Sequence, residues 1–454
     1  MRIKPLSKLV GAAAFIWSII VFSGMACTEG CGVAAANTAQ LPDLATSAVS
    51  PVSTNVITEW NQNAAALTLL PASALAPVQQ TRAMAIVQVG VHDAVNGITF
   101  KFETYLPQGP PPAGASPDAA AIAAAHQTLL GLFGDGPFAV LGNRTLGQVY
   151  ADSLAAHGLS PNDPGIEFGR SAANAILAER ANDHAAVAQF DYAVPGAGTP
   201  GVWTRINNAP ALLPGWGNVT PFVLKSGSQF RPDAPPALNS DVYTRDYNEI
   251  KDIGRQVGSS RTTLQSQIAT FWRASPTAIW NPIANQVISA NGLDISSTAR
   301  AYALFYLAAS DASVACWEAK YYYNSWRPQL AIRAGDLDGN DQTDVDLTWT
   351  PFVATPPHPE YPSGHTDNSG AMAFVLSSMF GNEPGATLEV TLSGITRQWN
   401  SFDQAVDEVI DARVFSGIHF RNSDEVGARQ GRQVAQFVLT HALRPCRGQG
   451  SRCS

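Results

Sequence analysis

The sequence predicts an all-α protein made of two packed helical bundles. Apolar residues recur with helical spacing in two groups of segments, at about 53–70, 76–97, 117–134, 141–157 and 163–187, and at about 241–256, 261–274, 296–326, 368–381, 385–399 and 422–442. Alternating patterns typical of strands are nearly absent from the chain. Helices that carry an apolar stripe and have short connections bury those stripes against one another, so each group is expected to form a bundle.

Composition sets the size of the core and excludes one class of partner. With 454 residues and 45% hydrophobic side chains, the chain is long and apolar enough for one large domain or two tightly packed ones. Its net charge is −8, and the lysines and arginines are scattered rather than gathered in a stripe. Because binding to nucleic-acid phosphates needs clustered cations, no nucleic-acid partner is expected.

The N-terminus has the pattern of an export signal. Three cations precede an apolar run from Leu9 to Phe22, and small residues lead up to Ala26 and Cys27. The run is shorter than the roughly 20 residues of a membrane-spanning helix, and no later segment is apolar enough to span. We therefore expect residues 1–26 to be a signal peptide and the mature chain to be exported, periplasmic or extracellular. Lipid attachment through Cys27 is the alternative.

Composition also divides the rest of the chain. Residues 27–52 are rich in Ala, Thr, Ser and Pro without periodicity, as in a flexible segment. The helical domain is expected at 53–454, with an N-terminal bundle at about 53–190 and a C-terminal bundle, carrying the active site, at about 241–445. Between them, residues 191–240 combine many prolines and glycines with several aromatic residues. That stretch is too aromatic for a free linker, so we expect it to wrap over the helices or to shape a site entrance.

Four of the five cysteines lie near the ends of the chain. Cys446 and Cys453 can pair with each other or with Cys27 and Cys31 in an oxidising compartment, and the sequence leaves that choice open. Cys316 stands alone inside an apolar helical pattern, so it is expected to be a small buried hydrophobic side chain.

Three short segments carry the residues suited to chemistry. The first runs from Trp317 to Pro328 and contains Lys320 and Arg327, seven positions apart. On a continuous helix of 3.6 residues per turn these two cations lie on nearly the same face, and Pro328 ends the helix. Three tyrosines and Trp326 stand between them. Such neighbours are not typical of a solvated charged face, so a buried pair of cations is expected.

The second segment is a proline-rich loop that leads into a helical pattern. It reads Pro-Pro-His-Pro-Glu-Tyr-Pro-Ser-Gly-His over residues 356–365. The prolines restrict the backbone, and Gly364 lets a ligand come close to its amide. Free N–H groups at the start of the next helix favour an anion. Ser363, Gly364 and His365 therefore predict an anion-binding loop with a histidine beside it.

The third segment places Arg413 six positions before His419. Taken in order, the three segments contain Lys, six residues, Arg-Pro; then Pro-Ser-Gly-His; then Arg, five residues, His. This order and spacing resembles the three-part signature of the vanadium haloperoxidases and the type 2 phosphatidic acid phosphatases. The resemblance covers about 310–430 closely, and residues 92–96 resemble the N-terminal helix of bacterial members. It implies two packed helical bundles of the vanadium haloperoxidase type.

The resemblance implies a role for each cation and donor. Lys320, Arg327 and Arg413 would hold the oxygens of a vanadate or phosphate. The Ser363 hydroxyl and the Gly364 amide would complete the hydrogen bonds. These donors suit an oxyanion, because arginine forks and backbone N–H groups recognise its oxygens well.

The two histidines of the signature take different roles by resemblance. His419 would bind vanadium as the single metal ligand from the protein, or attack phosphorus as a nucleophile. His365 would be the general acid and base, which its ordinary titration near neutrality allows. Phosphatase members usually place an Asp four residues after the nucleophilic His. Here Ser423 holds that position and Asp424 follows it, a departure that favours the peroxidase.

The halide pocket is expected around Trp317, His358 and Trp326. His358 stands five residues before Ser363, where family bromoperoxidases carry His and chloroperoxidases carry Phe. Trp317 stands where chloroperoxidases carry Trp and bromoperoxidases carry Arg, so the two markers disagree. A titratable histidine near the peroxide disfavours the harder oxidation of chloride. Iodide or bromide is therefore expected rather than chloride.

The resemblance implies a vanadate-dependent haloperoxidase that oxidises halide with hydrogen peroxide to a hypohalous-type species, which then reacts with a small organic acceptor. The alternative is an acid phosphatase, inhibited by vanadate, that uses His419 as its nucleophile. A catalytically silent oxyanion-binding protein would have lost signature residues, and all seven are present. The interlocked dimers of relatives make a homodimer a further expectation, by resemblance alone.

Overall fold

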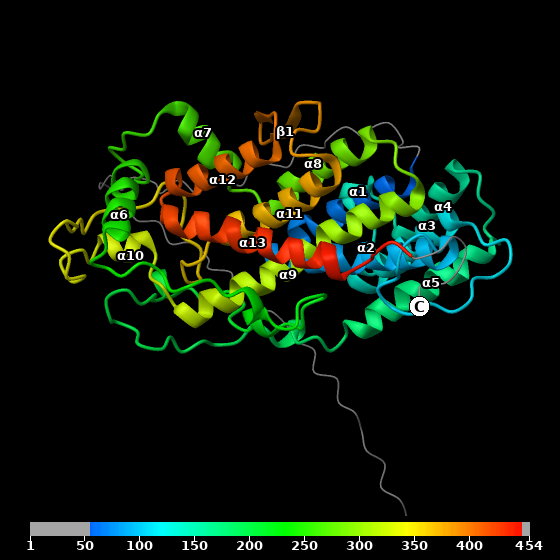
Figure 1. Ribbon diagram of the computed structural model, residues 1–454, viewed down its shortest axis with the longest axis horizontal. Helices are drawn as coiled ribbons and strands as arrows, with labels where there is room; N and C mark the ends of the chain where they lie inside the picture. The colour runs from blue at the N-terminus through cyan, green and yellow to red at the C-terminus, as the bar shows by residue number, and fades with distance from the viewer. Residues whose placement is uncertain (1–54, 447–454) are drawn as a thin grey trace, which may run out of the picture. The chain divides into compact units, whose positions relative to one another are not determined.

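The computed structural model describes residues 55–446, and nearly all regular structure in this range is α-helical (Figure 1). The predicted all-α fold is confirmed. The predicted signal peptide at 1–26 and the segment at 27–52 lie outside the described residues. The helices are α1 (Val56–Thr68), α2 (Pro77–Thr99), α3 (Pro117–Phe133), α4 (Leu146–Ala156), α5 (Pro164–Glu179), α6 (Asp241–Ile253), α7 (Thr263–Phe271), α8 (Pro276–Ala290), α9 (Ile295–Tyr323), α10 (Pro328–Ile332), α11 (Gly364–Phe380), α12 (Phe402–Phe415) and α13 (Arg421–His441).

Small side chains let the first helices pack closely. Helix α3 begins with an alanine-rich stretch and packs against α2, α4 and α5. A Cβ atom added to Gly169 of α5 would lie 2.1 Å from the carbonyl oxygen of Ala120 in α3. This distance is far below a van der Waals contact, so the approach of the two helices requires glycine at that position.

Helix α9 is the central helix of the described chain. It is buried on nearly every side, because α2, α11 and α13 all pack against it. A helix enclosed by others is apolar all round, which explains why its sequence lacks a polar stripe. Helices α11 and α13 also approach each other closely: a Cβ on Gly431 would lie 1.8 Å from the carbonyl oxygen of Asp367. This packing holds the N-terminus of α11 in place.

A long segment without α-helix, residues 180–240, joins α5 to α6 and passes along the lower edge of Figure 1. The buried carboxylate of Asp311 in α9 accepts hydrogen bonds from three successive backbone N–H groups, at 2.6 to 2.9 Å, from Phe222, Val223 and Leu224. The N–H of Leu212 donates to the carbonyl of Pro357 at 2.8 Å. These bonds attach the segment to α9 and to the proline-rich loop.

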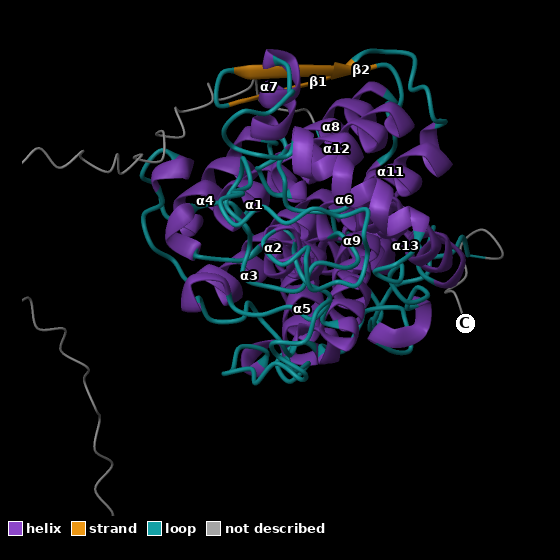
Figure 2. Ribbon diagram, turned by 90° about the vertical axis from the view of Figure 1, so that its left-hand side faces the viewer, coloured by secondary structure: helices purple, strands orange, loops and turns teal. Residues whose placement is uncertain are grey.

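The predicted helix at 385–399 is wrong. These residues form an antiparallel hairpin of β1 (Leu388–Leu392) and β2 (Ile395–Trp399), at one edge of the helices in Figure 2. Ser393 and Gly394 at the turn both have positive φ, +49° and +75°, which matches the twist of a two-residue hairpin turn. Buried and exposed residues alternate along β1, the period of a strand rather than a helix.

Other helix boundaries also differ from the sequence prediction. Helix α9 ends at Tyr323, not near 326, because Asn324 adopts a left-handed conformation (φ +49°) and stops it. Helices α8, α10 and α12 were not predicted. Pro282 inside α8 hides the helical pattern, since proline usually ends a helix. The helical class is thus predicted correctly, and several of the predicted helix boundaries are wrong.

The cysteines divide into two kinds. Cys316 is free and buried in α9, as the sequence predicted. Cys446 is disulfide-bonded, and its partner lies outside the described residues. The pairing that the sequence left open therefore stays open.

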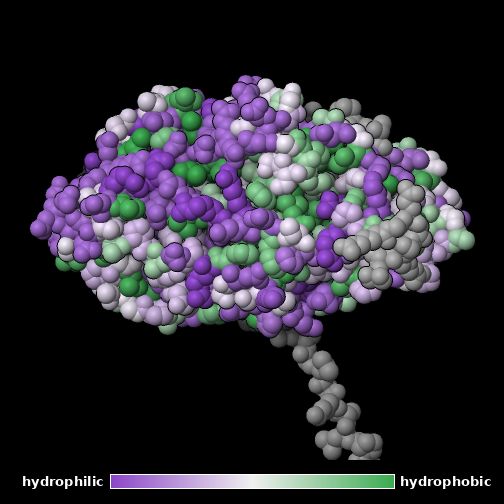
Figure 3. Space-filling view, in the orientation of Figure 1, coloured by the Kyte–Doolittle hydropathy of each residue, from purple (hydrophilic) through white to green (hydrophobic). Residues whose placement is uncertain are grey.

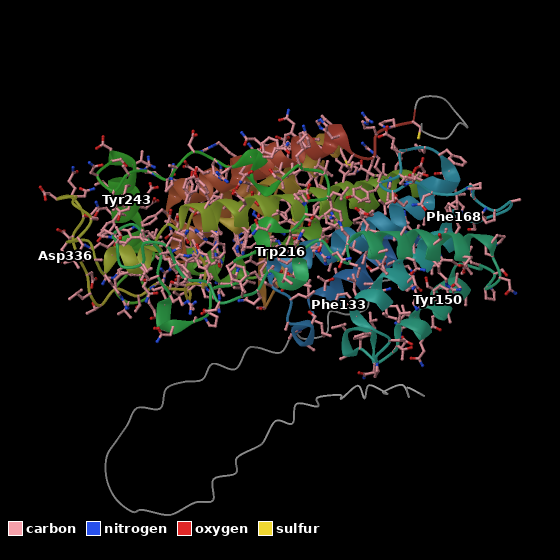
Figure 4. The ribbon with its side chains drawn as sticks, turned by 90° about the horizontal axis from the view of Figure 1, so that it is seen from below. Phe133, Tyr150, Phe168, Trp216, Tyr243 and Asp336 are labelled. Carbon is pink, nitrogen blue, oxygen red and sulfur yellow. The ribbon has the colours of Figure 1, made fainter. Side chains whose placement is uncertain are left out.

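Hydrophilic residues are unevenly distributed over the surface. On the face drawn in Figure 3, hydrophilic residues gather over the end where α6 and α10 lie. Figure 4 places Tyr243 and Asp336 at that end, Tyr150 and Phe168 at the opposite end, and Trp216 and Phe133 between them. Among residues 55–446, no helix is both long and apolar enough to cross a membrane.

Candidate functional site

The three sequence segments meet around one cavity, which we call the front cavity. It has about 590 Å³ of empty space. Two apolar sides come from the start of α2, from Pro276 and from Leu212. The remaining wall carries the halide-pocket candidates Trp317 and His358 and the signature residues Gly364, His365, Arg413 and His419. No Asp or Glu of the described residues lines it. A cavity with this lining suits an anion.

Lys320 and Arg327 reach the site by a different route from the one predicted. They do not share one helix face, because α9 ends at Tyr323 and Arg327 is the N-cap of the short helix α10. Both side chains are fully buried. The Lys320 ammonium donates to the carbonyls of Pro359 and Glu360, at 3.1 and 2.8 Å. Chain reversal after Tyr323, rather than helix periodicity, brings the two cations together.

Arg327 ties the second segment to the third. Its Nε donates to the carbonyl of His358 at 2.9 Å, and its Nη1 donates to the carbonyl of Ile418 at 2.7 Å. Nη1 also lies 3.0 Å from His419 Nε2, and Nη2 lies 2.9 Å from His358 Nδ1. Because arginine only donates, His419 Nε2 must be an acceptor, which assigns the tautomer of that imidazole. His358 Nδ1 also lies 3.2 Å from the carbonyl of Pro359, which only accepts, so Arg327 does not fix the tautomer of His358.

His419 is held on its other side by a carboxylate. Its Nδ1–H donates to Glu360 Oε1 at 2.9 Å, and the Phe420 N–H donates to the same oxygen at 3.0 Å. Nδ1 therefore carries the proton, and the unprotonated Nε2 accepts from Arg327 at the front cavity. Sequence reasoning missed Glu360. The signal was a lone carboxylate inside the proline-rich loop, three residues before Ser363.

Asp424, which follows the position where phosphatase members usually carry an Asp, does not hydrogen-bond His419. Its fully buried carboxylate is close to Ser363 and Arg413, and burial raises its pKa well above the ordinary value. Ser423 contributes its carbonyl oxygen, which accepts from the Ser363 N–H at 3.1 Å. The residues after His419 thus support the anion loop, while Glu360 orients the imidazole.

The start of α11 offers free donors. Ser363 is the N-cap of α11, yet its hydroxyl does not cap the helix. Ser363 Oγ and Arg413 Nε are both buried and have no hydrogen-bond partner of good geometry. A Cβ on Gly364 would lie 3.1 Å from the Trp317 ring, a tight contact, and 3.8 Å from Lys320 Cε, so glycine leaves the most room for a ligand at this amide.

Arg413 and His365 are positioned by the connection between α7 and α8. The Arg413 Nη1 donates to the carbonyl of Trp272 at 2.9 Å. The His365 Nε2 lies 3.2 Å from the carbonyl of Ala274, which makes Nε2 the protonated nitrogen. His365 is half-buried and has no second protein partner, so Nδ1 remains available to the cavity.

Comparison with known proteins agrees with this geometry. Residues 300–448 match the model of the second helical-bundle domain of vanadium chloroperoxidase. Over 203 residues, 38% of this chain, the sequence is 24% identical to vanadium chloroperoxidase from Curvularia inaequalis, and the match spans only 33% of that enzyme's length. The crystal structure of the first bacterial vanadium-dependent iodoperoxidase is similar over 87% of this chain and 98% of its own, with a TM-score of 0.73 and 25% identity.

A bacterial vanadium-dependent chloroperoxidase, solved in its apo form, shares the fold over 81% of this chain and 95% of its own, with a TM-score of 0.62 and 18% identity. The chain is therefore similar to vanadium haloperoxidases, in sequence over its second helical bundle and in fold over most of its length. The resemblance inferred from the three segments is therefore confirmed. Every signature residue of the superfamily that the sequence offered lies at or beside the front cavity.

The charges of this haloperoxidase-type site are incompletely compensated. Burial lowers the pKa of Lys320 to about 8 and lowers the pKa of both Arg327 and Arg413 to about 10. Burial raises the pKa of Glu360 to about 7, although Arg327 opposes the shift. Each shift disfavours the charged form because the group has lost its water. A bound oxyanion would supply the missing negative charge and stabilise all three cations.

The histidines of the site are held neutral. Burial lowers the pKa of His365 well below its ordinary value, and the neighbouring Arg413 adds to the shift. The pKa of His419 is lowered in the same way, by burial first and by Arg327 next. From the sequence we expected the pKa of His365 to lie near neutrality. Without an anion the ring is instead neutral and able to accept a proton.

The three residues expected at the halide pocket do not all line the same cavity. The rings of Trp317 and His358 are 4.9 Å apart and line the front cavity side by side. Burial also lowers the pKa of His358 well below its ordinary value, so this ring is uncharged. Trp326 does not line the front cavity: it packs with Tyr243 and Phe420 in a separate part of the core. Its assignment to the halide pocket is corrected accordingly.

Proposed function

We propose that this chain is a vanadate-dependent haloperoxidase that oxidises iodide, and bromide more slowly, with hydrogen peroxide. The donor set carries the proposal. One unprotonated imidazole nitrogen, His419 Nε2, which accepts only from Arg327, is surrounded by the charges of Lys320, Arg327 and Arg413, in a cavity that no described carboxylate lines. The bacterial iodoperoxidase with the same fold supports the choice of halide.

The residues fit an oxygen-rich anion of vanadium. Arginine forks, a lysine, the Ser363 hydroxyl and the Gly364 N–H would hold its oxygens, and His419 Nε2 would be its one ligand from the protein. Ser363 Oγ and Arg413 Nε support this, because neither makes a hydrogen bond of good geometry, although the Asp424 carboxylate is close to both residues, and buried donors normally have acceptors. When bound, vanadate supplies Lewis acidity that polarises hydrogen peroxide for attack by halide, with no change in the metal's oxidation state.

The side chains have separate tasks in this reaction, in which hydrogen peroxide, halide and one proton give hypohalous acid and water. His365 accepts a proton from the incoming peroxide at Nδ1 and returns it to the oxygen that leaves as water. Arg413 beside His365 makes return of the proton easier, because it lowers the pKa of the ring. Glu360 keeps the His419 ring in the tautomer that presents Nε2.

The lining of the front cavity favours a large halide. Leu212, Val78 and three prolines form its apolar sides. A poorly hydrated anion loses less on entering such surroundings than a strongly hydrated one, so iodide is preferred over bromide and bromide over chloride. Since His358 is neutral, the preference follows from desolvation and not from a titrating histidine.

The location and the assembly of the enzyme are further proposals. We propose that the mature protein is exported and acts on a small organic acceptor, which reacts with the oxidised halogen. The N-terminal pattern supports export, and a homodimer is proposed by resemblance to the superfamily. Mass spectrometry of the mature chain and its sedimentation in solution test these two points.

An acid phosphatase is the second candidate. The Glu360–His419 pair favours it, because a carboxylate that accepts from Nδ1–H also prepares Nε2 for attack on phosphorus. Vanadate would then be an inhibitor instead of a cofactor.

The test uses purified mature protein freed of vanadate and supplied with hydrogen peroxide. Iodide, bromide and chloride are oxidised in turn, with and without added orthovanadate. We expect oxidation only with vanadate, fastest for iodide. Equal rates for the three halides would refute the desolvation argument, and hydrolysis of a phosphate ester with no halide oxidation would assign the protein to the phosphatases.

A further inference from the structure

A second cavity borders the hydrogen-bonded pair of Glu360 and His419. We call it the rear cavity. Glu360 lines the rear cavity, while its hydrogen-bond partner His419 lines the front one, so this pair is the wall between them. The rear cavity has about 440 Å³ of empty space, part of which is open to solvent. The mechanism proposed above leaves it without a role.

The rear cavity is built mainly from aromatic and apolar side chains. Trp326, Tyr243 and Phe420 form one side, and Leu238 with two prolines of the segment before α6 forms another. The Tyr243 and Phe420 rings are 5.7 Å apart and tilted by 56°, and Figure 4 places Tyr243 at the α6 end of the chain. Trp326 is 5% exposed, and its Nε1 has no hydrogen-bond partner of good geometry. Aromatic faces in such an arrangement attract cations.

Two carboxylates complete the lining. Asp246 and Glu360 are each 2% exposed, and no Lys, Arg or His of the described residues lines the rear cavity. Asp246 accepts from Arg245, which lies outside the cavity, and from the Asn422 N–H. Two donors to Glu360, the His419 Nδ1–H and the Phe420 N–H, bind its Oε1. The Ser423 hydroxyl, which also lines the rear cavity, hydrogen-bonds the same carboxylate, so a ligand would share Glu360 with these donors.

We propose that the rear cavity binds a small organic ammonium ion with an aromatic or short aliphatic body. The carboxylates accept hydrogen bonds from the ammonium group, and the aromatic rings cover its apolar body and face its charge. The opposite chemistry holds in the front cavity, which has cations and no carboxylate. The two cavities of this chain are thus suited to ligands of opposite charge.

The test measures binding by calorimetry on the full mature protein without vanadate, peroxide or halide, so it does not depend on the proposed function. Benzylammonium is the probe, and benzyl alcohol and benzoate are its neutral and anionic counterparts. We expect benzylammonium to bind one site, with benzyl alcohol at least about tenfold weaker, because a charge-assisted hydrogen bond is about twice as strong as a neutral one. Equal affinity of the ammonium and the alcohol would overturn the proposal.

Substitutions locate the site. Asp246→Asn keeps the shape of the side chain and the bond from Asn422, and should weaken benzylammonium binding about tenfold while leaving benzyl alcohol unchanged. Trp326→Phe should weaken it severalfold, since tryptophan is the best partner of a cation. Glu318→Gln is the matched control, because this carboxylate pairs with Arg231 and lines neither cavity. An Asp246→Asn protein that binds as tightly as the parent would refute the assignment, and if it does not fold, the probe series on the parent chain decides alone.

Discussion

Replacing Glu360 with Gln tests how the protein prepares His419 for an oxyanion. In the parent chain Glu360 Oε1 accepts from both the His419 Nδ1–H and the Phe420 N–H, at 2.9 and 3.0 Å. Glutamine has an oxygen in the same position, so both bonds can persist. The substitution removes the negative charge alone. Glu360→Ala removes the acceptor as well and leaves two buried donors unpaired.

The contacts of Glu360 determine how much vanadate affinity each substitution should remove. A residue that orients a metal ligand typically contributes 10- to 100-fold to affinity, or about 1.4 to 2.8 kcal/mol. We expect the lower value, about tenfold weaker vanadate binding, for Glu360→Gln, because only charge assistance is lost. For Glu360→Ala we expect about 100-fold, because each unpaired buried donor costs about 1 to 3 kcal/mol.

The assay is equilibrium binding of orthovanadate to the vanadate-free protein, followed by vanadium NMR. Glu318→Gln is the matched control, since it removes an equal charge away from the front cavity. Unfolding temperatures are measured beside it, to separate loss of fold from loss of affinity. Vanadate affinity of Glu360→Gln within twofold of the parent would refute the view that this carboxylate prepares His419.

Four further results are expected. His419→Ala should abolish vanadate binding, and stoichiometric retention of vanadate would contradict the ligand assignment. His365→Ala should keep vanadate while halide turnover falls on the order of a hundredfold, and unchanged turnover would remove it from the mechanism. Because the pKa of Lys320 is about 8, binding of sulfate, whose own charge is constant, should be strongest below pH 8 and weaken above it, and a Lys320→Met protein should lack this pH dependence. Leu212→Ala should raise the rate with a bulky organic hydroperoxide about tenfold relative to hydrogen peroxide without changing vanadate affinity, and an unchanged ratio would show that Leu212 does not limit the entrance.

The sequence predicted the helical class and the residues of the oxyanion site, because both depend on local patterns. Apolar periodicity marks most helices, and the signature residues lie in three short segments whose spacing is visible in the chain. The helix predicted at 385–399 was wrong because the apolar residues in this segment fit both helical and strand spacing. Only the turn at Ser393 and Gly394 distinguishes a hairpin from a helix here. A turn of two residues is a weak signal within a long apolar pattern.

The remaining errors concern contacts between distant segments. Arg327 meets Lys320 through a chain reversal that the helical wheel does not contain. Glu360 binds His419, 59 positions away, and no rule of spacing connects the two. Trp326 lies one residue from Arg327 yet points into a different cavity, because the backbone there is extended and neighbouring side chains point in opposite directions. These placements follow from packing of whole elements.

The central claim is that one vanadate, bound at His419, makes this chain a haloperoxidase. We would titrate the vanadate-free protein with orthovanadate while following iodide oxidation by hydrogen peroxide, with the His419→Ala protein beside it. The account predicts a rate that rises from zero and reaches a plateau at one vanadium per chain, and no rise for His419→Ala. Iodide oxidation that is independent of added vanadate, or equal in the two proteins, would contradict it.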